Sequence, residues 1–324
     1  MSINDLGGDY PTTWDSFVGQ ENAKRQLMVA CKSARLRGET MEHVLIASSE
    51  PGIGKTALAL LCARELNATV KVISGKVNVS QARIALSELQ DGDVLFIDEI
   101  HMLVQGGKGN AEWLLHLLQD GVLMGPMGPE VQPKITIIGA TTDVGRLPKT
   151  IIDRFQKRPD LSPYSHEDAT RIALSKASKL FTTPLTPFPS VENCEAIATA
   201  GNHNPRVIGH ILSNLRDIAV TTDAANYDKK TRTYDLSEAL DWMGLTDDGL
   251  DRVARRYLVA LLKDFAGGAG QRALADRLGE TGGLGHVEQV LMAKGLIAKT
   301  KQGRVLTQSG IHRARAVERN EEAA

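Results

Sequence analysis

The sequence predicts an α/β fold with a parallel sheet, followed by helical segments and a C-terminal winged helix. Four apolar runs of strand length alternate with helical stretches between residues 43 and 140, and this alternation is typical of a parallel sheet covered by helices. Near the C-terminus, three short helical stretches precede two strand-like runs around a Gln-Gly turn. That order is typical of a winged helix.

Each predicted strand is short, apolar and flanked by loop or helical residues. The helical stretch TALALLCAREL follows the first strand after a glycine-rich loop, and the pattern breaks at RPDLSPY, residues 158–164. The four predicted strands are HVLIASS (43–49), VKVIS (70–74), DVLFID (93–98) and KITIIGA (134–140).

Three domains are expected from these patterns. Residues 1–163 form the large α/β domain. Residues 164–245 form a small helical domain, interrupted by the loops FTTPLTPFPS and TTDAANYDKKTRT. Residues 246–324 form the winged-helix domain, with the helical stretches GLDRVARRYLVALLKDF, QRALADRLG and GHVEQVLMAKGLI and the wing KGLIAKTKQGRVLTQSG.

The composition is typical of a soluble globular protein. The chain has 324 residues, of which 42% are apolar and 24% charged, so it can bury sizeable cores. No apolar stretch approaches the roughly 18 to 20 residues that a membrane-spanning helix needs, and the N-terminus shows no secretory signal. Cys31, Cys62 and Cys194 lie far apart without metal-ligand spacing, which favours a reducing cytoplasm.

Positive charge is concentrated near the C-terminus. Residues 252–316 contain 12 lysines and arginines against 4 acidic residues, a net charge of +8, although the whole chain has a net charge of −1. The remainder therefore carries −9. A solvated helical face could account for one basic cluster, but a whole basic end beside an acidic body indicates a polyanionic partner.

Residues 47–60, ASSEPGIGKTALAL, resemble the phosphate-binding pattern G-x-x-x-x-G-K-[ST], with Ser49 at the position of the first glycine. Such a loop points backbone N–H groups at phosphate oxygens beside a helix N-terminus. Gly52 and Gly54 allow close backbone approach, Lys55 reaches the β and γ phosphates, and Thr56 offers a hydroxyl to Mg²⁺. An ordinary glycine turn is the alternative.

The run LFIDE ends a predicted strand with two carboxylates. In a nucleotide hydrolase Asp98 would hold Mg²⁺ and Glu99 would polarise the attacking water. Adjacent acids at a strand end could also be a solvated turn. Together with the GKT loop about 40 residues earlier, they predict ATP hydrolysis with ATP and Mg²⁺ as cofactors.

Several motifs occur in the order found in the RuvB family, the hexameric AAA+ motors that drive Holliday-junction branch migration. They are TTWDSFVGQENAKRQL, RGETMEHVLIA, PGIGKTALA, GDVLFIDEIH, IIGATTDVG, DRF, NPRVIGHIL and KQGRVLTQSG. The resemblance covers residues 12–312. It implies an AAA+ P-loop ATPase core, a helical lid domain and a DNA-binding winged helix, acting on duplex and branched DNA as a homohexamer in the cytoplasm.

The resemblance also implies roles for individual residues. Thr142 is similar to sensor 1, Arg206 to sensor 2, and Arg154 to the arginine finger that reaches a neighbouring subunit's ATP. Without the resemblance, a turn-capping hydroxyl and surface ion pairs would explain these three. The residues that match nucleotide-binding positions are Phe17, Val18 and Tyr164 around the adenine, and Pro51, Gly52, Ile53, Gly54, Lys55, Thr56, Ala57 and Arg206 around the phosphates.

At the basic end, Arg304 at the tip of the wing resembles the DNA-contacting arginine of the family, with Lys299 and Lys301 adding charge. A solvated hairpin tip is the alternative. Residues 122–134 resemble the hairpin that grips the junction-binding partner RuvA, but the segment is shorter and rich in glycine and proline.

Three residues depart from the family pattern: Ser49, Glu50, and Ile152, which stands where a second arginine is usual. His101 and His203 are assigned no chemistry. Two other functions remain open at this point: a clamp-loader or helicase-loader type of ATP switch, and a DNA-binding module with a degenerate ATPase.

Overall fold

The computed structural model describes residues 10–104, 111–183, 185–280, 283–301 and 303–323. It divides into two compact units. The first unit extends to Ile172 and includes Asn204–Arg206, and the second consists of Ala173–His203 and the chain from Val207 onward. Among the described residues, none of the helices combines the length and the apolar character needed to cross a membrane.

The first unit contains the predicted parallel sheet, and all four predicted strands are confirmed. The spatial order is β1-β6-β3-β2, and every neighbouring pair is parallel. Aliphatic and aromatic side chains make the two central strands, β3 and β6, almost fully buried. The strands are β1 (Val44–Ala47), β2 (Val70–Ser74), β3 (Val94–Asp98) and β6 (Thr136–Thr141).

A further extended segment runs along the free edge of β1. The Leu45 N–H donates to the Lys157 carbonyl at 2.9 Å, the Lys157 N–H donates to the His43 carbonyl at 3.1 Å, and Ala47 bridges to Asp160 in parallel. The sequence predicted a break in the pattern here. Residues 157–160 instead pair with β1 as a short extended segment at the edge of the sheet. Their polar composition is not typical of a strand, so the sequence did not predict this pairing.

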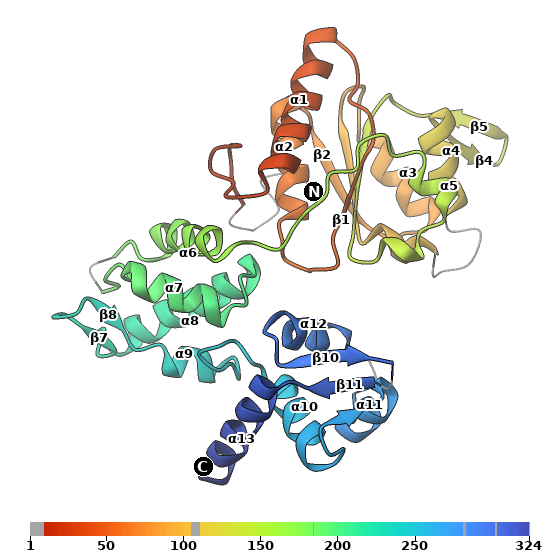
Figure 1. Ribbon diagram of the computed structural model, residues 1–324. Coiled ribbons are helices and arrows are strands. Elements are labelled where there is room, and N and C mark those ends of the chain that lie inside the picture. The colour runs from red at the N-terminus through yellow and green to blue at the C-terminus, as the bar shows by residue number, and fades with distance from the viewer. Residues whose placement is uncertain (1–9, 105–110, 184, 281–282, 302, 324) are drawn as a thin grey trace. The chain divides into compact units, whose positions relative to one another are not determined.

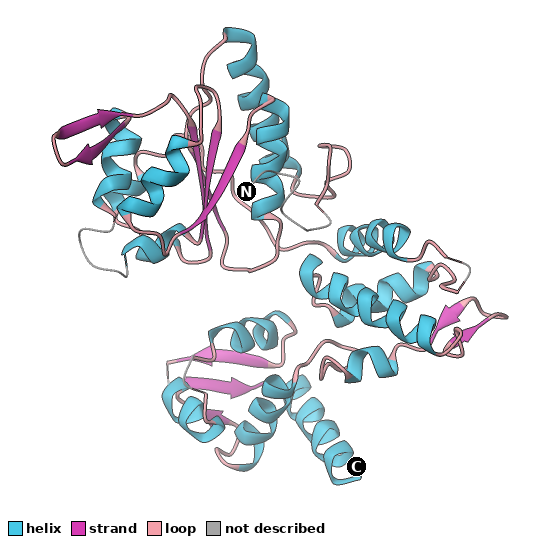
Figure 2. Cartoon of the chain, turned by 180° about the vertical axis from the view of Figure 1, so that it is seen from behind, coloured by secondary structure: helices cyan, strands magenta, loops and turns pink. Residues whose placement is uncertain are grey.

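Helices cover both faces of this sheet (Figure 2). Helices α1 and α2 pack against each other, while Trp113, Leu114 and Leu117 of α4 join the core on the side of α3 and α5 (Figure 1). The predicted hairpin is present as β4 and β5. The elements are α1 (Glu21–Arg37), α2 (Lys55–Leu66), α3 (Val79–Ser87), η2 (Ile100–Val104), α4 (Glu112–Asp120), β4 (Val122–Gly125), β5 (Gly128–Val131), η3 (Val144–Arg146) and α5 (Lys149–Ile152).

The strand order determines where the motifs meet. Because β6 lies between β1 and β3, the carboxyl ends of these three strands are adjacent at one edge of the sheet. The glycine-rich loop follows β1, the acidic pair ends β3, and Thr142 follows β6. Ligands of open α/β sheets bind at such an edge, beyond the carboxyl ends of the strands.

The second unit begins inside α6 with a group of helices. A short antiparallel hairpin, β7 with β8, lies in the segment that was expected to be a loop, and the rings of Tyr227 and Tyr234 pack there with centroids 4.8 Å apart. The elements are α6 (His166–Leu180), α7 (Val191–Ala200), α8 (Pro205–Thr221), β7 (Tyr227–Asp228), β8 (Thr233–Tyr234) and α9 (Ser237–Asp241).

The winged helix follows in the same unit, as predicted. Its sheet has the order β10-β11-β9, and Asp251 caps α10 by accepting from the Ala254 N–H at 2.7 Å. Helix α13, which the sequence analysis missed, packs along α10. The elements are α10 (Arg252–Lys263), β9 (Gly268–Ala269), α11 (Gln271–Leu278), α12 (Gly285–Ala293), β10 (Ile297–Thr300), β11 (Gly303–Leu306) and α13 (Gln308–Ala323).

Candidate active site

The loop between β1 and α2 depends on glycine at two positions. Gly52 has a φ of +81° and Gly54 a φ of +113°, a region that other residues rarely adopt. A Cβ added at Gly54 would also lie 3.0 Å from the ring of Phe17. These two glycines therefore allow the backbone to turn toward the N-terminus of α2, where N–H groups can face an anion.

Ser49, at the position of the family's first glycine, does not have a positive φ and is exposed at the end of β1. No glycine is needed for this backbone conformation. The departure from the phosphate-loop pattern therefore introduces no backbone strain at this position.

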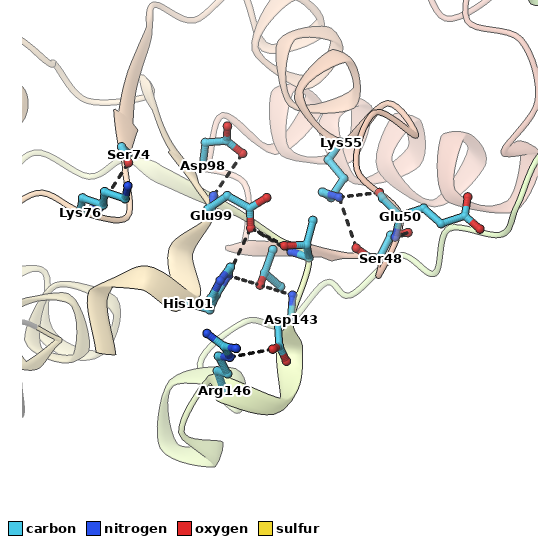
Figure 3. Close-up of polar contacts among 12 residues, drawn as sticks. Ser48, Glu50, Lys55, Ser74, Lys76, Asp98, Glu99, His101, Asp143 and Arg146 are labelled. Atoms are coloured by element: carbon cyan, nitrogen blue, oxygen red, sulfur yellow. Dashed lines mark hydrogen bonds and ion pairs between the residues drawn. The ribbon is translucent and has the colours of Figure 1, made fainter. Parts of the chain in front are cut away.

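Lys55 lies inside the loop, and it is only 7% exposed. Its Nζ donates to the carbonyl oxygens of Ser48 at 3.3 Å and Glu50 at 3.0 Å. Burial lowers the pKa of Lys55, while Glu99 and Asp98 raise it. Figure 3 shows the Glu50 carboxylate pointing away from Lys55, although its charge still raises the pKa of Lys55 slightly.

Asp98 ends β3 and is partly buried. Burial raises the pKa of Asp98, the neighbouring Glu99 raises it further, and Lys55 and Arg206 oppose these effects. The carboxylate therefore lies where additional positive charge would stabilise its ionised form.

Asp98 and the Thr56 hydroxyl are oxygen donors of the kind that Mg²⁺ prefers, and Mg²⁺ usually takes only one or two protein ligands beside phosphates. No cluster of three or more His, Cys, Asp or Glu residues suited to a metal occurs in the described residues.

Glu99 is held against the end of β6. Its Oε2 accepts from the Thr142 N–H at 3.0 Å and from the Thr142 hydroxyl at 2.8 Å. Glu99 also has a φ of +48°, an unfavourable conformation for a residue with a side chain. The structure thus brings the two residues predicted as water activator and sensor into direct contact (Figure 3).

His101 contacts the same carboxylate, which the sequence analysis missed. The side chain is buried, and its Nδ1 lies 3.2 Å from Glu99 Oε2 and 2.9 Å from the Thr141 hydroxyl. His101 lies in η2, just after the end of β3, and Thr141 is the last residue of β6. Only the pairing of these two strands brings the two side chains together. His203 occupies a left-handed turn with a φ of +58°, after α7.

Gly75 is a second residue that the sequence did not reveal. Its N–H donates to the Asp98 carbonyl at 2.7 Å, and a Cβ added at Gly75 would lie 2.1 Å from the backbone oxygen of Glu99. The end of β2 therefore supports the backbone of the acidic pair at a distance that only glycine permits.

We predict that Gly75→Ala sharply lowers ATP turnover, because the new methyl group must displace the backbone that carries Glu99. Turnover by the purified variant is measured beside Gly92→Ala, whose added Cβ would meet no atom within 4 Å. Gly92 has a φ of +90°, which strains an alanine, whereas Gly75 has no positive φ. If Gly75→Ala turned over ATP at the rate of the wild type and of Gly92→Ala, the close approach at Gly75 would not be required.

Two aromatic residues that were predicted to pack around the adenine, Phe17 and Tyr164, flank the loop. Phe17 is 3% and Tyr164 7% exposed, and the Tyr164 hydroxyl donates to the Ile53 carbonyl at 3.0 Å. Burial raises the pKa of the Tyr164 hydroxyl. Gly19 makes room for this ring, since a Cβ there would lie 2.8 Å from Tyr164 Cε1. Val18, between Phe17 and Gly19, is partly exposed.

Arg206 lies beside the loop within the first unit. The Asn204 amide donates to the Pro51 carbonyl at 2.7 Å, and a Cβ added at Gly52 would meet the Arg206 Cβ at 2.8 Å. Arg206 also contributes to the pKa shifts of Lys55 and Asp98. Contact of Arg206 with a bound phosphate stays a prediction.

Arg154 follows α5 and contacts a different part of the unit. Its Nη2 donates to the Gln119 side chain of α4 at 2.8 Å, and its buried Nε has no acceptor within the described part of the chain. Ile152, which replaces an arginine of the family pattern, packs against the hydrophobic core. The action of Arg154 on a neighbouring subunit stays a prediction.

In the wing, the structure corrects the expected position of Arg304. The residue lies within β11, opposite Lys299 of β10, and not at the tip. Its side chain donates to Glu288 Oε2 at 2.8 Å and to the Gln271 side chain at 3.0 Å. Lys299 and Lys301 are exposed, and Gln302 lies outside the described residues.

Comparisons with known proteins agree with this architecture. The family described as the Holliday junction DNA helicase RuvB P-loop domain matches residues 10–161, and the RuvB C-terminal winged helix domain matches residues 247–314. The Holliday junction branch migration complex subunit RuvB of Thermotoga maritima is 34% identical over 92% of this chain and 89% of its own length. The chain belongs to the RuvB family. The RuvB subunit of Kosmotoga olearia is 32% identical over 92% of this chain and 87% of its own length.

Solved structures support the assignment to RuvB. The T. maritima RuvB Holliday junction branch migration motor has a TM-score of 0.78 at 30% identity, covering 94% of this chain and 97% of that one. As a member of the RuvB family, the chain is a P-loop ATPase of the AAA+ type with a C-terminal winged-helix domain. The predicted family and fold class are thus confirmed, and the RuvB match favours neither the loader nor the degenerate-ATPase alternative.

Proposed function

We propose that this protein is an ATP-driven motor that moves duplex DNA and so branch-migrates Holliday junctions. Its relatives carry the name of that complex. The observation that carries the proposal is the contact of Glu99 with Thr142, at the sheet edge that also holds Lys55, in a chain that ends in a winged helix.

In this proposal the phosphates of ATP bind to the backbone N–H groups of residues 52–57, and Lys55 exchanges two loop carbonyls for phosphate oxygens. Glu99 orients the attacking water and accepts its proton, while Thr142 holds the carboxylate in place. Arg206 contacts the phosphates from the other side of Gly52. Thr56 and Asp98 would hold Mg²⁺, which would neutralise charge on the phosphates.

The assembly is also a proposal. Arg154 would complete the site of the next subunit in a homohexamer, acting in the cytoplasm. The three-domain division at residues 163 and 245 stays a proposal.

A RuvA-like partner would bind the hairpin of β4 and β5, where Met124, Met127 and Val131 are exposed. Arg83 of α3 holds this hairpin by an ion pair with Glu130 and a 3.0 Å hydrogen bond to the Met124 carbonyl.

The test combines ATPase activity with strand exchange. Purified protein is expected to hydrolyse ATP with Mg²⁺, to do so faster with a synthetic four-way junction, and to dissociate that junction into duplexes. Lys55→Ala serves as the inactive control. An ATPase rate that branched DNA does not change, together with a junction that stays undissociated, would contradict the motor function and favour an ATP switch.

A further inference from the structure

A buried histidine lies against the carboxylate of Glu99. His101 is only 6% exposed, and its neighbours Ile100 and Leu103 on η2 are fixed in the hydrophobic core. The Met102 N–H donates to the Glu99 carbonyl at 2.9 Å, so η2 is tied directly to the backbone of the acidic pair. Packing therefore holds the imidazole in one place, and a buried polar ring of this kind needs hydrogen-bond partners.

The surroundings of Nδ1 determine where the imidazole carries its proton. Nδ1 lies 2.9 Å from the Thr141 hydroxyl and 3.2 Å from Glu99 Oε2 (Figure 3). An unprotonated Nδ1 would turn its lone pair toward a carboxylate oxygen, which is an acceptor only. A protonated Nδ1 can donate to both oxygens. The hydrogen-bond network thus assigns a proton to Nδ1.

The two oxygens of the Glu99 carboxylate then differ. Oε2 accepts from the Thr142 N–H, from the Thr142 hydroxyl and from His101 Nδ1–H. Oε1 accepts no hydrogen bond from the residues that the structure describes. The terminal torsion of a glutamate side chain is soft, so donors from two separate segments, η2 and the end of β6, are needed to fix the plane of the carboxylate.

We infer that His101 is a positioning residue for ATP hydrolysis: its Nδ1–H holds Glu99 Oε2 and leaves Oε1 free to accept the proton of the attacking water. This inference rests on the proposed function, in which Glu99 is the general base. His101 acts through Glu99, so it affects turnover and not ATP affinity. The effect is expected to be large because misplacing a reacting group by about 1 Å can cost about 10²-fold in rate.

The experiment compares two variants of nearly the same shape in the full chain. His101→Leu removes both ring nitrogens, whereas His101→Asn places an amide N–H near the position of Nδ1. His101→Leu should lower kcat by about 10-fold to 100-fold, while the affinity for a fluorescent ATP analogue stays at the wild-type value. His101→Asn should restore most of the lost turnover, because its amide can donate to both Glu99 and Thr141.

His43→Leu is the matched control. The Nδ1 atom of His43 accepts from the Ile137 N–H at 3.1 Å, so this histidine also hydrogen-bonds to β6, but at the opposite end of the strand from Thr141. Both leucine variants should lower Tm, and only His101→Leu should lose turnover. A decrease in kcat that follows the decrease in Tm equally in both variants would make His101 merely structural and overturn the inference.

A double variant tests whether His101 acts through Glu99. In single-turnover measurements on a Glu99→Gln background, His101→Leu should cause little further loss, because residues that act through one group are not additive. An equally large loss on that background would show that His101 acts independently of Glu99. If His101→Leu does not fold, His101→Phe is measured in its place, since it keeps the volume of the ring without its nitrogens.

The outcomes for the inference and for the proposed function are distinct. Wild-type kcat in His101→Leu, with Glu99→Gln inactive, would overturn the inference and leave Glu99 as the general base. Wild-type turnover in Glu99→Gln would instead contradict the proposed mechanism, on which the role of His101 depends.

Discussion

Glu99→Gln should stop ATP turnover while ATP still binds. The glutamine amide oxygen can keep accepting from Thr142, whose N–H and hydroxyl lie 3.0 and 2.8 Å from the present carboxylate oxygen. An amide cannot take a proton from water, so the variant loses general-base catalysis, which typically contributes about 10² to 10⁴ in rate. Phosphate release measures turnover, and titration with a fluorescent ATP analogue measures binding.

Two control variants separate the loss of turnover from a loss of nucleotide binding. Glu50→Gln makes the same chemical change on the loop, but the Glu50 carboxylate points away from Lys55 (Figure 3), and turnover should persist. Lys55→Ala should instead lose nucleotide affinity, because Lys55 is the buried cation of the loop. Turnover at the wild-type rate in Glu99→Gln would remove Glu99 from the mechanism.

Arg154→Ala should be nearly inactive although its own nucleotide site is intact. The Arg154 side chain contacts Gln119 of α4, whereas Arg206 is the arginine beside the loop. Under the proposed assembly Arg154 acts on the neighbouring subunit, and arginine fingers contribute about 10³ to 10⁵ in rate. ATP affinity of Arg154→Ala should equal that of the wild type, measured with the same fluorescent analogue.

Mixing Arg154→Ala with Glu99→Gln should restore part of the activity. Some interfaces of a mixed ring would pair an intact Glu99 on one subunit with an intact Arg154 on the next. Co-assembly is verified by pulling down one tagged variant with the other. A co-assembled mixture that stays inactive would place Arg154 in its own subunit's site or outside catalysis.

The sequence alone determined the strands, the loop and the acidic pair. These features depend on local chemistry: apolar runs form buried strands, glycine spacing allows a positive φ at Gly52 and Gly54, and a strand end places Asp98 and Glu99 at the sheet edge. The wing was visible for the same reason, as two short strands about a turn. Helix α13 was missed because its sequence QSGIHRARAVERNEEA is mostly polar and only a narrow face packs on α10.

Only the tertiary structure decided which side chains meet. Thr142 reaches Glu99, and His101 reaches Thr141, because β6 pairs with β3; Gly75 reaches Glu99 because β2 pairs on the other side. The sequence predicts that Arg304 is an exposed cation of the wing, but in the structure Arg304 forms an ion pair with the buried Glu288 of α12. The reason is the same in both cases: a buried charge or hydrogen-bonding group requires a partner, and that partner comes from whichever distant segment the fold packs against it.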